Sequence, residues 1–531
     1  MTQSSKTIEF TTAQSNQTQD EVFRFLSQPS SYLPTIVDQV EIRETHGAMV
    51  FLAGDCAYKL KRSVRLAYLD FSTLALREKA CRHEIERNAT FSSDIYLGVS
   101  PIVRLANGGL QIGTSQPGSE VIDWVVVMKR FDDSLLLDKL AQERTLPVSL
   151  MPALAETVAD SHTKAPVRKN HHGEVALDAV VAQIIQSHQA APSLLGPDQV
   201  DRFAGRIRHA LSDVSALLEE RSRSGSVRLC HGDLHLRNLV LIAGRPTLFD
   251  AIEFDDEIST VDVLYDLAFL LMDLWHRGLK AHANLCFNTY ASQAMSSKQL
   301  SGLQALPLFM AARAGIRGMV AIDRLKVCPA CERKAVLREI EQYFELASSV
   351  LTLKKPTLAV VGGRSGTGKS TLAQGLAPGF GNAPGALHLR SDVERKRMLN
   401  VAPLDRLPLQ AYSEGQNEAV YKRLVSRATV ALEAGHSVIV DAVFLSQMHR
   451  DWLHQVARQN HSSFVGLWLC APQDVMVDRV EHRKDDASDA HAGVVRKQMS
   501  LNTDPTEWHR IDANASPEIV LSAARAALDA V

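Results

Sequence analysis

Two short segments of the sequence carry residue types that handle phosphate groups. They read His231-Gly232-Asp233-Leu234-His235-Leu236-Arg237-Asn238 and Gly363-Arg364-Ser365-Gly366-Thr367-Gly368-Lys369-Ser370. The first offers a carboxylate at Asp233 and an amide oxygen at Asn238, groups able to accept a proton or to ligate a metal ion. In the second, backbone N–H groups of the glycine-rich loop would surround phosphates and Lys369 would neutralise them. We therefore expect two ATP sites, or one site that uses ATP and one that senses it.

The second segment has the sequence context that a phosphate-binding loop, or P-loop, requires. A strand is predicted over 357–361 and a helix over 369–377, so the loop joins a strand to a helix N-terminus. The loop residues, together with Thr371 in the first turn, are expected to bind the nucleotide. Ser370 is also expected to ligate Mg²⁺, because its hydroxyl follows the lysine of the motif.

Three residues downstream indicate a kinase rather than a motor or switch ATPase. Asp392 and Arg395 follow a predicted strand over 386–389, and Asp441 ends a buried strand over 437–441. The spacing of the first two resembles the Asp-x-x-Arg site of phage polynucleotide 5'-kinase and its small-molecule kinase relatives. That resemblance implies that Asp392 is the base for an acceptor hydroxyl and that Arg395 grips an acceptor anion. Asp441 would reach the metal ion through water.

A pair of arginines further on predicts a lid. Arg479 and Arg483 are four residues apart, which would place them on one face of a helix, and Ser488-Asp489-Ala490 follows. The arrangement resembles the lid of the same kinase group, in which arginines close on the transferring phosphoryl group. The alternative is that both arginines are solvated on a helix surface.

The first segment resembles the catalytic loop of aminoglycoside, choline and fructosamine kinases, and it shares the spacing of the protein-kinase loop. The resemblance implies that Asp233 orients the acceptor hydroxyl, and that Asn238 and Asp250 hold the metal ions. Asp250 follows a predicted strand pair over 239–242 and 247–250. Asp266, at the start of a predicted helix, is expected to be structural.

The same resemblance implies a strand lysine that neutralises phosphates and a glutamate that pairs with it. Lys59 fits the lysine, and Lys61 is its rival because it lies two residues on, on the same strand face. Glu84 is chosen as the partner over Glu78 and Glu86 by analogy.

The order of elements predicts a mixed α/β and α+β protein of two domains. Residues 1–350 would form a two-lobed domain like protein kinases and aminoglycoside phosphotransferases. Residues 351–531 would form a P-loop kinase domain with a parallel sheet, because strands and helices alternate there. The boundary is placed at 351–356, where a proline separates a helical stretch from a strand.

Composition narrows the class of protein and its location. The chain has 531 residues and a net charge of −2, which does not suggest a strongly basic nucleic-acid binder. No apolar run approaches the roughly 20 residues that cross a bilayer, and residues 1–20 do not have the order of a secretory signal. The seven cysteines are scattered, so we expect free thiols in the cytoplasm. Cys328-Pro329-Ala330-Cys331 lacks the extra ligands of a zinc site or the preceding strand of a redox motif.

The chain as a whole resembles bacterial proteins that fuse an aminoglycoside-phosphotransferase-like domain to a P-loop kinase domain. The first hypothesis is a soluble, Mg²⁺-dependent ATP phosphotransferase with two sites. The front site would phosphorylate a small hydroxylated molecule. The back site would act on a sugar or nucleotide-type acceptor, with a polynucleotide end less favoured. In the alternative, the front domain senses a nucleotide or ligand and regulates the P-loop kinase, because only Gly47 lies where a glycine-rich loop is expected. Antibiotic inactivation by the front domain is a third hypothesis.

Overall fold

The computed structural model describes residues 13–530, except 46, 66–69, 115–116, 170, 484–485 and 502–503. The first twelve residues of the segment examined for a secretory signal therefore lie outside the described residues. The chain divides into two compact units. The first unit comprises the residues up to 146, together with 160–168 and 227–266. The second comprises 147–159, 169–226 and the residues from 267 onward.

A six-stranded antiparallel sheet forms the larger part of the first unit, with strand order β1-β2-β3-β6-β4-β5. Its strands are β1 (Val40–Glu44), β2 (Ala48–Ala53), β3 (Cys56–Lys61), β4 (Tyr96–Arg104), β5 (Leu110–Ile112) and β6 (Glu120–Lys129). The helix α2 (Leu74–Ser92) connects β3 to β4 and packs against β4 and β6. On the sheet, Phe51, Leu60 and Val125 are fully buried together with Val22 and Leu26 of α1 (Ala13–Leu26).

Two short strand pairs frame the predicted catalytic loop of the first unit. Strand β7 (Val227–Leu229) pairs with β10 (Thr260–Asp262), and β8 (Leu239–Ile242) pairs with β9 (Arg245–Leu248). The segment 231–238 lies between β7 and β8, and Asp250 lies two residues after the end of β9. Both ends of the segment are thus fixed by strand hydrogen bonds.

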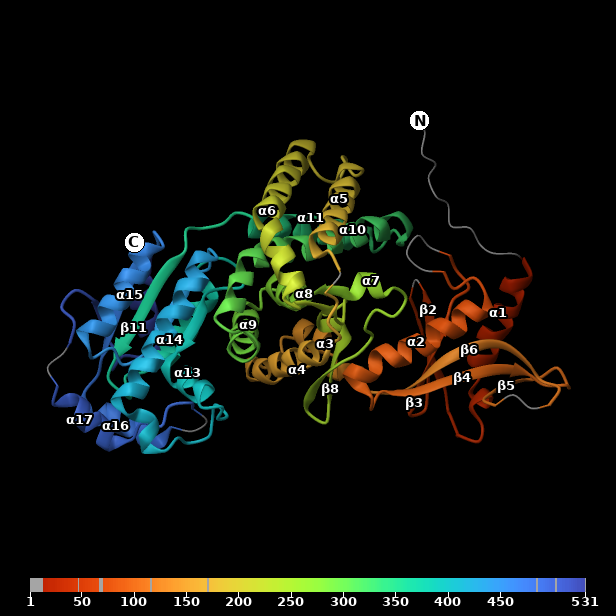
Figure 1. Ribbon diagram of the computed structural model, residues 1–531. Helices are drawn as coiled ribbons and strands as arrows, with labels where there is room; N and C mark the ends of the chain where they lie inside the picture. The colour runs from red at the N-terminus through yellow and green to blue at the C-terminus, as the bar shows by residue number, and fades with distance from the viewer. Residues whose placement is uncertain are drawn as a thin grey trace. The chain divides into compact units, whose positions relative to one another are not determined.

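The second unit begins with helices. They are α5 (Gly173–Gln189), α6 (Pro197–Arg223), α9 (Lys280–Ala294), α10 (Leu306–Val327) and α11 (Arg333–Val350), with the 3-10 helix η5 (Lys298–Ala305) between α9 and α10. Two further helices, α4 (Met151–Lys164) and α8 (Val263–His276), contribute residues to both units. Figure 1 shows α9 beside the α/β part of this unit, which the contacts of α9 with β12 confirm.

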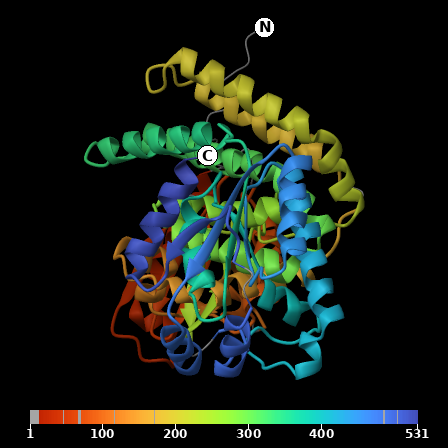
Figure 2. The same ribbon diagram turned by 90° about the vertical axis from the view of Figure 1, so that its left-hand side faces the viewer.

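The rest of the second unit is a five-stranded parallel sheet with strand order β12-β13-β11-β14-β15. Its strands are β11 (Thr357–Gly363), β12 (Leu387–Arg390), β13 (Val438–Asp441), β14 (Ser463–Cys470) and β15 (His509–Asp512). Its helices are α12 (Lys369–Leu376), α13 (Ser391–Met398), α14 (Glu414–Glu433), α15 (Gln447–Gln459), α16 (Gln473–His482), α17 (Ala492–Met499) and α18 (Pro517–Asp529). Helices cover both faces of this sheet (Figure 2).

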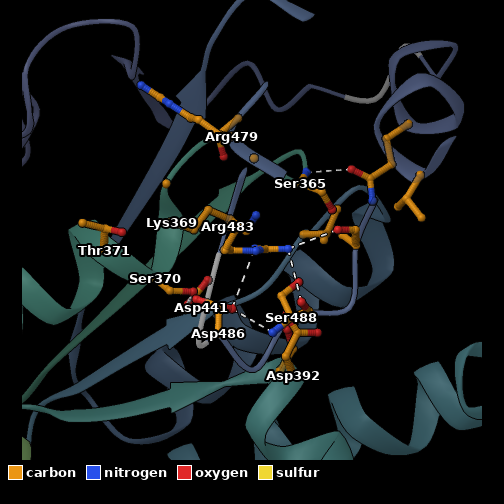
Figure 3. Close-up of a pocket in the computed structure, with 18 of the residues that line it drawn as sticks. Ser365, Lys369, Ser370, Thr371, Asp392, Asp441, Arg479, Arg483, Asp486 and Ser488 are labelled. Carbon is orange, nitrogen blue, oxygen red and sulfur yellow. Dashed lines mark hydrogen bonds and ion pairs between the residues drawn. The ribbon is translucent and has the colours of Figure 1, made fainter. Parts of the chain in front are cut away.

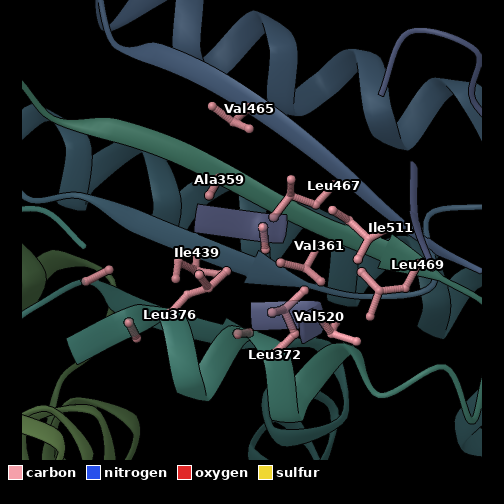
Figure 4. Close-up of a cluster of buried hydrophobic side chains, with 14 of the residues drawn as sticks. Ala359, Val361, Leu372, Leu376, Ile439, Val465, Leu467, Leu469, Ile511 and Val520 are labelled. Atoms are coloured by element: carbon pink, nitrogen blue, oxygen red, sulfur yellow. The ribbon is translucent and has the colours of Figure 1, made fainter. Parts of the chain in front are cut away.

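One apolar core fixes the strands on which the P-loop is built. Val361 of β11 and Ile439 of β13 pack with Leu372 and Leu376 of α12, and Val520 of α18 closes the cluster (Figure 4). These strands are apolar along nearly their whole length because both faces of a parallel sheet are buried. The core therefore anchors the strand before the P-loop and the helix after it.

The observed topology confirms the predicted fold class. The first unit carries the antiparallel sheet and the two short strand pairs around the 231–238 segment, and the second carries the alternating strands and helices of a P-loop fold. The compact units do not follow the predicted boundary, because the helices from 267 to 350 group with the parallel sheet. Their hydrogen bonds explain the grouping, since Asn284 of α9 donates to the carbonyls of Pro384 and Ala386. Where the folding domains end stays a prediction.

Within the described residues, one helical stretch has the length and composition that could cross a membrane. It runs over Lys298–Val327, and 72% of its most apolar window is buried inside the protein. The core helix of a soluble protein passes the same test, so this stretch is weak evidence for a membrane span.

Candidate functional sites

The P-loop conformation depends on its glycines. Gly366 and Gly368 adopt φ values of 85° and 86°, the left-handed region that side chains other than glycine disfavour. A Cβ at Gly366 would lie 2.4 Å from the carbonyl oxygen of Met476. Gly368 is the N-cap of α12, so the loop delivers Lys369 and Ser370 to the first turn of that helix. This is the arrangement in which a helix N-terminus and backbone N–H groups receive a phosphate.

Lys369 is half-buried and makes one hydrogen bond within the protein. Its Nζ donates to the carbonyl oxygen of Arg364 at 3.0 Å, and burial lowers the pKa of its ammonium. No ion pair to Lys369 occurs in the part of the chain that the structure describes. An ammonium whose partner is a single carbonyl can be taken over by phosphate oxygens at little cost.

The Ser370 hydroxyl donates to Asp441 Oδ2 at 2.5 Å. Burial opposes the charge of Asp441, but His388 and Arg390, which lie 3.5 and 3.8 Å from Oδ2, outweigh it and hold the pKa of the carboxyl below its ordinary value. Burial also lowers the pKa of His388. A hydroxyl and an ionised carboxylate side by side are the oxygen donors that Mg²⁺ prefers.

Asp392 lies in the first turn of α13, immediately after β12. Burial raises the pKa of its carboxyl, and a hydrogen bond with Ser488 only partly offsets this. Figure 3 shows Asp392 below Asp441 and Lys369 in the same cavity. The cavity has a volume of about 1470 Å³, and Lys369, Asp392 and Asp441 all line it. A carboxyl group with a raised pKa in such a cavity suits a general base.

Two arginines that the sequence predicted to bind the nucleotide or the acceptor, Arg364 and Arg395, form hydrogen bonds within the protein. Arg364 donates to the carbonyls of Gln498 and Leu501 and pairs with Asp504 at 2.7 Å, and it is not among the residues that line the cavity. Arg395 does line the cavity, but its guanidinium donates to Ala411 and Asn417 and stacks 4.7 Å from the Tyr412 ring. Neither role is tested by these contacts, and both stay predictions.

The prediction that Arg479 and Arg483 share one helix face is wrong. Helix α16 ends at His482, and Arg483 is its extended C-cap, with φ −66° and ψ 133°. The Arg483 guanidinium leaves the helix because it donates to the carbonyls of Ser488 and Ala490 in the next loop. Arg479 donates to the Ala513 carbonyl, and Figure 3 shows it directed away from Arg483. Both still line the cavity, so their role as a lid stays a prediction.

The sequence interpretation missed three polar residues of this site. Arg390 lies 3.8 Å from Asp441 and 3.3 Å from Asp486, so it joins the end of β12 to the segment before Ser488. His388 faces Asp441 from the same strand. Their alternation along β12 is a signal, because residues two apart on a strand point to one side.

In the first unit, Lys59, Glu84 and Asp250 meet. Lys59 Nζ lies 2.8 Å from Glu84 Oε1 and 2.7 Å from Asp250 Oδ1, and Glu84 is fully buried. Burial opposes the charge of Lys59, but the two carboxylates outweigh it and raise its pKa well above the ordinary value. Asp250 has a left-handed backbone with φ 60°, which Asp tolerates better than most residues. The three residues are thus held by one ion-pair network.

The rival lysine belongs to the same network. Lys61 Nζ lies 2.5 Å from Glu84 Oε2 and also pairs with Glu253. The side chain of Lys61 is 1% exposed and that of Lys59 is 13% exposed. Lys59 alone reaches Asp250, so of the two it is the better placed to meet a nucleotide.

The 231–238 loop brings Asp233 and Asn238 together. Asn238 Nδ2 donates to Asp233 Oδ2 at 2.8 Å and to the Asp233 carbonyl at 3.0 Å. His235 Nε2 lies 3.3 Å from the same carboxylate. Because the Asn238 amide donates through its nitrogen, its oxygen is the atom that would face a metal ion.

Asp266, which the sequence assigned a structural role, binds the backbone of the 231–238 loop. Its oxygens accept from the N–H groups of His231 and Gly232 at 3.3 and 2.9 Å. His162, Cys230 and Asp266 have the geometry of a metal-ligand cluster among the described residues, and all three are buried. The Asp266 carboxylate is hydrogen-bonded to the loop backbone and lies 3.2 Å from His162 Nε2. These contacts favour a structural role for the cluster.

Comparisons with known proteins agree with this arrangement. The family model described as "AAA domain" matches residues 358–505. The uncharacterized protein Rv2004c of Mycobacterium tuberculosis strain H37Rv is 30% identical over 482 residues, which cover 89% of this chain and 92% of that protein. The uncharacterized protein Mb2027c of Mycobacterium bovis matches with the same values, 30% over 482 residues.

The chain belongs to the family of Rv2004c and Mb2027c. Since the match spans nearly all of both chains, this family shares the front part as well as the P-loop part. The AAA-domain match agrees with the phosphate-binding groups above and supports a nucleotide-binding P-loop within residues 358–505.

Three solved structures are similar in fold. A sugar kinase from Janibacter is 22% identical and covers 33% of this chain and 95% of its own, with a TM-score of 0.26. A choline/ethanolamine kinase family protein from Mesorhizobium loti is 16% identical and covers 63% and 99%, with a TM-score of 0.36. The GDP complex of aminoglycoside 2'-phosphotransferase-IIIa is 13% identical and covers 62% and 99%, with a TM-score of 0.38. At such identities and TM-scores, these likenesses assign no activity to this chain.

Proposed function

We propose that the protein is a soluble, cytoplasmic, Mg²⁺-dependent phosphotransferase with two ATP sites. One observation carries the proposal: a single cavity is lined by the P-loop, by the Ser370–Asp441 pair and by Asp392, whose pKa is raised. These are a phosphate cradle, a metal-binding pair and a base, which are the parts that phosphoryl transfer requires. All seven cysteines are free, which supports a cytoplasmic location.

At the P-loop site the acceptor would be a sugar or nucleotide-type hydroxyl. Asp392 takes the hydroxyl proton while the oxygen bonds to the γ-phosphorus, and the bond from that phosphorus to the β–γ bridging oxygen breaks, so that ADP leaves. The P-loop N–H groups and Lys369 hold the phosphates throughout. Mg²⁺, held by Ser370 with Asp441 behind it, would neutralise charge on the phosphate oxygens.

At the front site the acceptor would be a small hydroxylated molecule. Asp233 takes the hydroxyl proton, and Lys59, oriented by Glu84, neutralises the α- and β-phosphates. Asn238 and Asp250 are oxygen donors that fit Mg²⁺. For this site to bind a nucleotide, Lys59 must exchange its contact with Asp250 for phosphate oxygens.

That contact also supports the second candidate function. In the structure the phosphate-binding lysine and the metal-binding carboxylate of the front site are bonded to each other, at 2.7 Å. A site that must first break an ion pair suits a sensor of nucleotide or ligand that regulates the P-loop kinase.

One experiment separates the two functions. ATP consumption is measured across a panel of sugars, nucleosides, oligonucleotides and other hydroxylated metabolites, using wild type, Asp233→Ala and Lys369→Ala. Two kinase sites predict that each variant loses a different set of activities. A regulatory front part predicts that Lys369→Ala loses every activity, whereas Asp233→Ala changes only the dependence of the rate on a ligand. No consumption with any compound would count against both.

A further inference from the structure

The edge of the parallel sheet in the second unit is covered by side-chain amides. Strand β12 is the edge strand, so its outer backbone groups lack a neighbouring strand. Asn288 of α9 supplies both partners: its Nδ2 donates to the Ala386 carbonyl at 3.1 Å, and its Oδ1 accepts from the His388 N–H at 2.6 Å. One amide group thus replaces one peptide group of a missing strand.

Asn284, one turn earlier on α9, extends this contact. Its Nδ2 donates to the carbonyls of Ala386 and Pro384 at 3.0 and 3.1 Å, and the residue is 3% exposed. A Cβ at Gly385 would lie 2.7 Å from this nitrogen, and Gly385 has φ 96°. The backbone before β12 is therefore shaped to admit the amide.

Buried charges hold the other end of α9. Arg427 of α14 is fully buried and donates to the carbonyls of Met295 and Ala291, at 2.7 and 3.1 Å, where α9 ends. Glu394 of α13, 2% exposed, lies 3.0 Å from the same guanidinium. Buried charges are costly unless paired and hydrogen-bonded, so this contact is specific rather than incidental packing.

The strand that α9 holds carries the acceptor side of the P-loop site. His388 and Arg390 on β12 face Asp441, and Asp392 begins the helix that follows. The nucleotide-binding strand β11 is separated from β12 by β13. The segment before β12 meets the C-terminal end of α12, where the Ala386 N–H donates to the carbonyl of the C-cap Ala377 at 2.9 Å. Loosening β12 should therefore disturb Asp392 more than the P-loop, which lies at the opposite end of α12.

We propose that α9 is a positioning element of the P-loop kinase, whose Asn284 and Asn288 fix β12 and thereby the place of Asp392 relative to the bound nucleotide. The inference rests on the proposed function only in assigning the acceptor base to Asp392. Residues 280–294, which the sequence groups with the front domain, are in this view a working part of the second kinase site.

The test uses full-length Asn288→Ala and Asn284→Ala, with Asn460→Ala as the matched control. Asn460 caps α15 through the Val456 carbonyl at 2.9 Å and lies outside β12. Amide hydrogen exchange is followed by mass spectrometry, and ADP affinity is measured with Mg²⁺ present. We expect exchange over residues 386–392 to rise about tenfold or more in both α9 variants, with β11 unchanged and ADP affinity within about twofold.

Three results would overturn the proposal: unchanged exchange over 386–392, a uniform rise across the whole sheet, or loss of ADP affinity equal to the loss of turnover. Where the metabolite panel yields an acceptor, both α9 variants should lower kcat about tenfold or more and the control should not. If no acceptor is found, the proposed function fails while the exchange result still decides whether α9 holds β12.

Discussion

The two predicted phosphate sites differ in the partners that their lysines have in the absence of a nucleotide. Lys369 donates to one backbone carbonyl, whereas Lys59 is paired with both Glu84 and Asp250. The P-loop is shaped by glycines with left-handed backbones, and the Ser365 N–H within it donates to Gln498 Oε1 at 2.7 Å. The front site has paired side-chain charges in the corresponding place. At the P-loop, the lysine and this N–H have hydrogen bonds to neutral acceptors to exchange for a phosphate, whereas the front site must first break an ion pair between two charged side chains.

The difference also predicts which of the two lysines contributes to the stability of the fold. Burial is unfavourable to the charge of Lys369 and lowers the pKa of its ammonium, and no ion pair to Lys369 occurs among the described residues. Lys59 is favoured as a cation by its neighbours and helps to neutralise a fully buried glutamate. The P-loop lysine should therefore be dispensable for folding and the front lysine should not.

The largest expected effect is at the P-loop base. Asp392→Asn keeps the shape of the side chain but cannot accept a proton, so P-loop-dependent turnover should fall by about 10² to 10⁴-fold. Coupled ADP release with the acceptor found in the metabolite panel measures it. Asp474→Asn, an exposed carboxylate on α16, is the matched control. A fall of less than about threefold would exclude Asp392 as the base.

The next effect compares the two lysines directly. Lys369→Ala should lower P-loop turnover by about 10² to 10³-fold and leave the thermal unfolding midpoint unchanged or raised. Lys59→Ala should lower the free energy of unfolding by about 1–3 kcal/mol, because it leaves buried Glu84 short of one partner. Turnover and calorimetry on the same preparations test both. Equal destabilisation by the two variants would contradict the comparison.

The pH dependence of the P-loop reaction should report the raised pKa of Asp392. Asp392 must be ionised to act, and burial raises its pKa, so kcat/KM of the P-loop reaction should fall as pH drops through a value above the ordinary ~3.9 of aspartate. The acid limb should be absent from the residual activity of Asp392→Asn. A wild-type limb at or below the ordinary aspartate value would show that burial does not govern this group.

The smallest effect is expected at Arg364, which the motif placed among the nucleotide ligands. Because its guanidinium is bonded to the 498–504 segment, Arg364→Lys should change ADP affinity by less than about threefold while loosening that segment. Titration with a fluorescent ADP analogue and local hydrogen exchange measure the two effects. A loss of ADP affinity of tenfold or more would show that Arg364 does bind the phosphates, as the motif predicted.

Much of the fold and the core of each site could be predicted from local patterns. The P-loop spacing predicted the β11-to-α12 turn because only that backbone path places glycines and lysine correctly. The choice of Glu84 came from resemblance, and the structure brings it to Lys59, although its role is untested. The shared helix face of Arg479 and Arg483 failed because the end of α16 depends on carbonyls in a later loop.

What the sequence determined by itself is the set of groups whose spacing is local: the P-loop, the Asp233–Asn238 loop and the alternation that makes a parallel sheet. Only the tertiary structure decided which charged groups pair with each other. Lys59 pairs with Asp250, whereas Lys369 donates only to a backbone carbonyl. The tertiary structure also placed the amides of α9 on the edge of β12, about 100 residues away along the chain. Local spacing is set by backbone geometry, whereas partners at long range are chosen by burial, since a buried polar group must find its partner wherever the fold brings one.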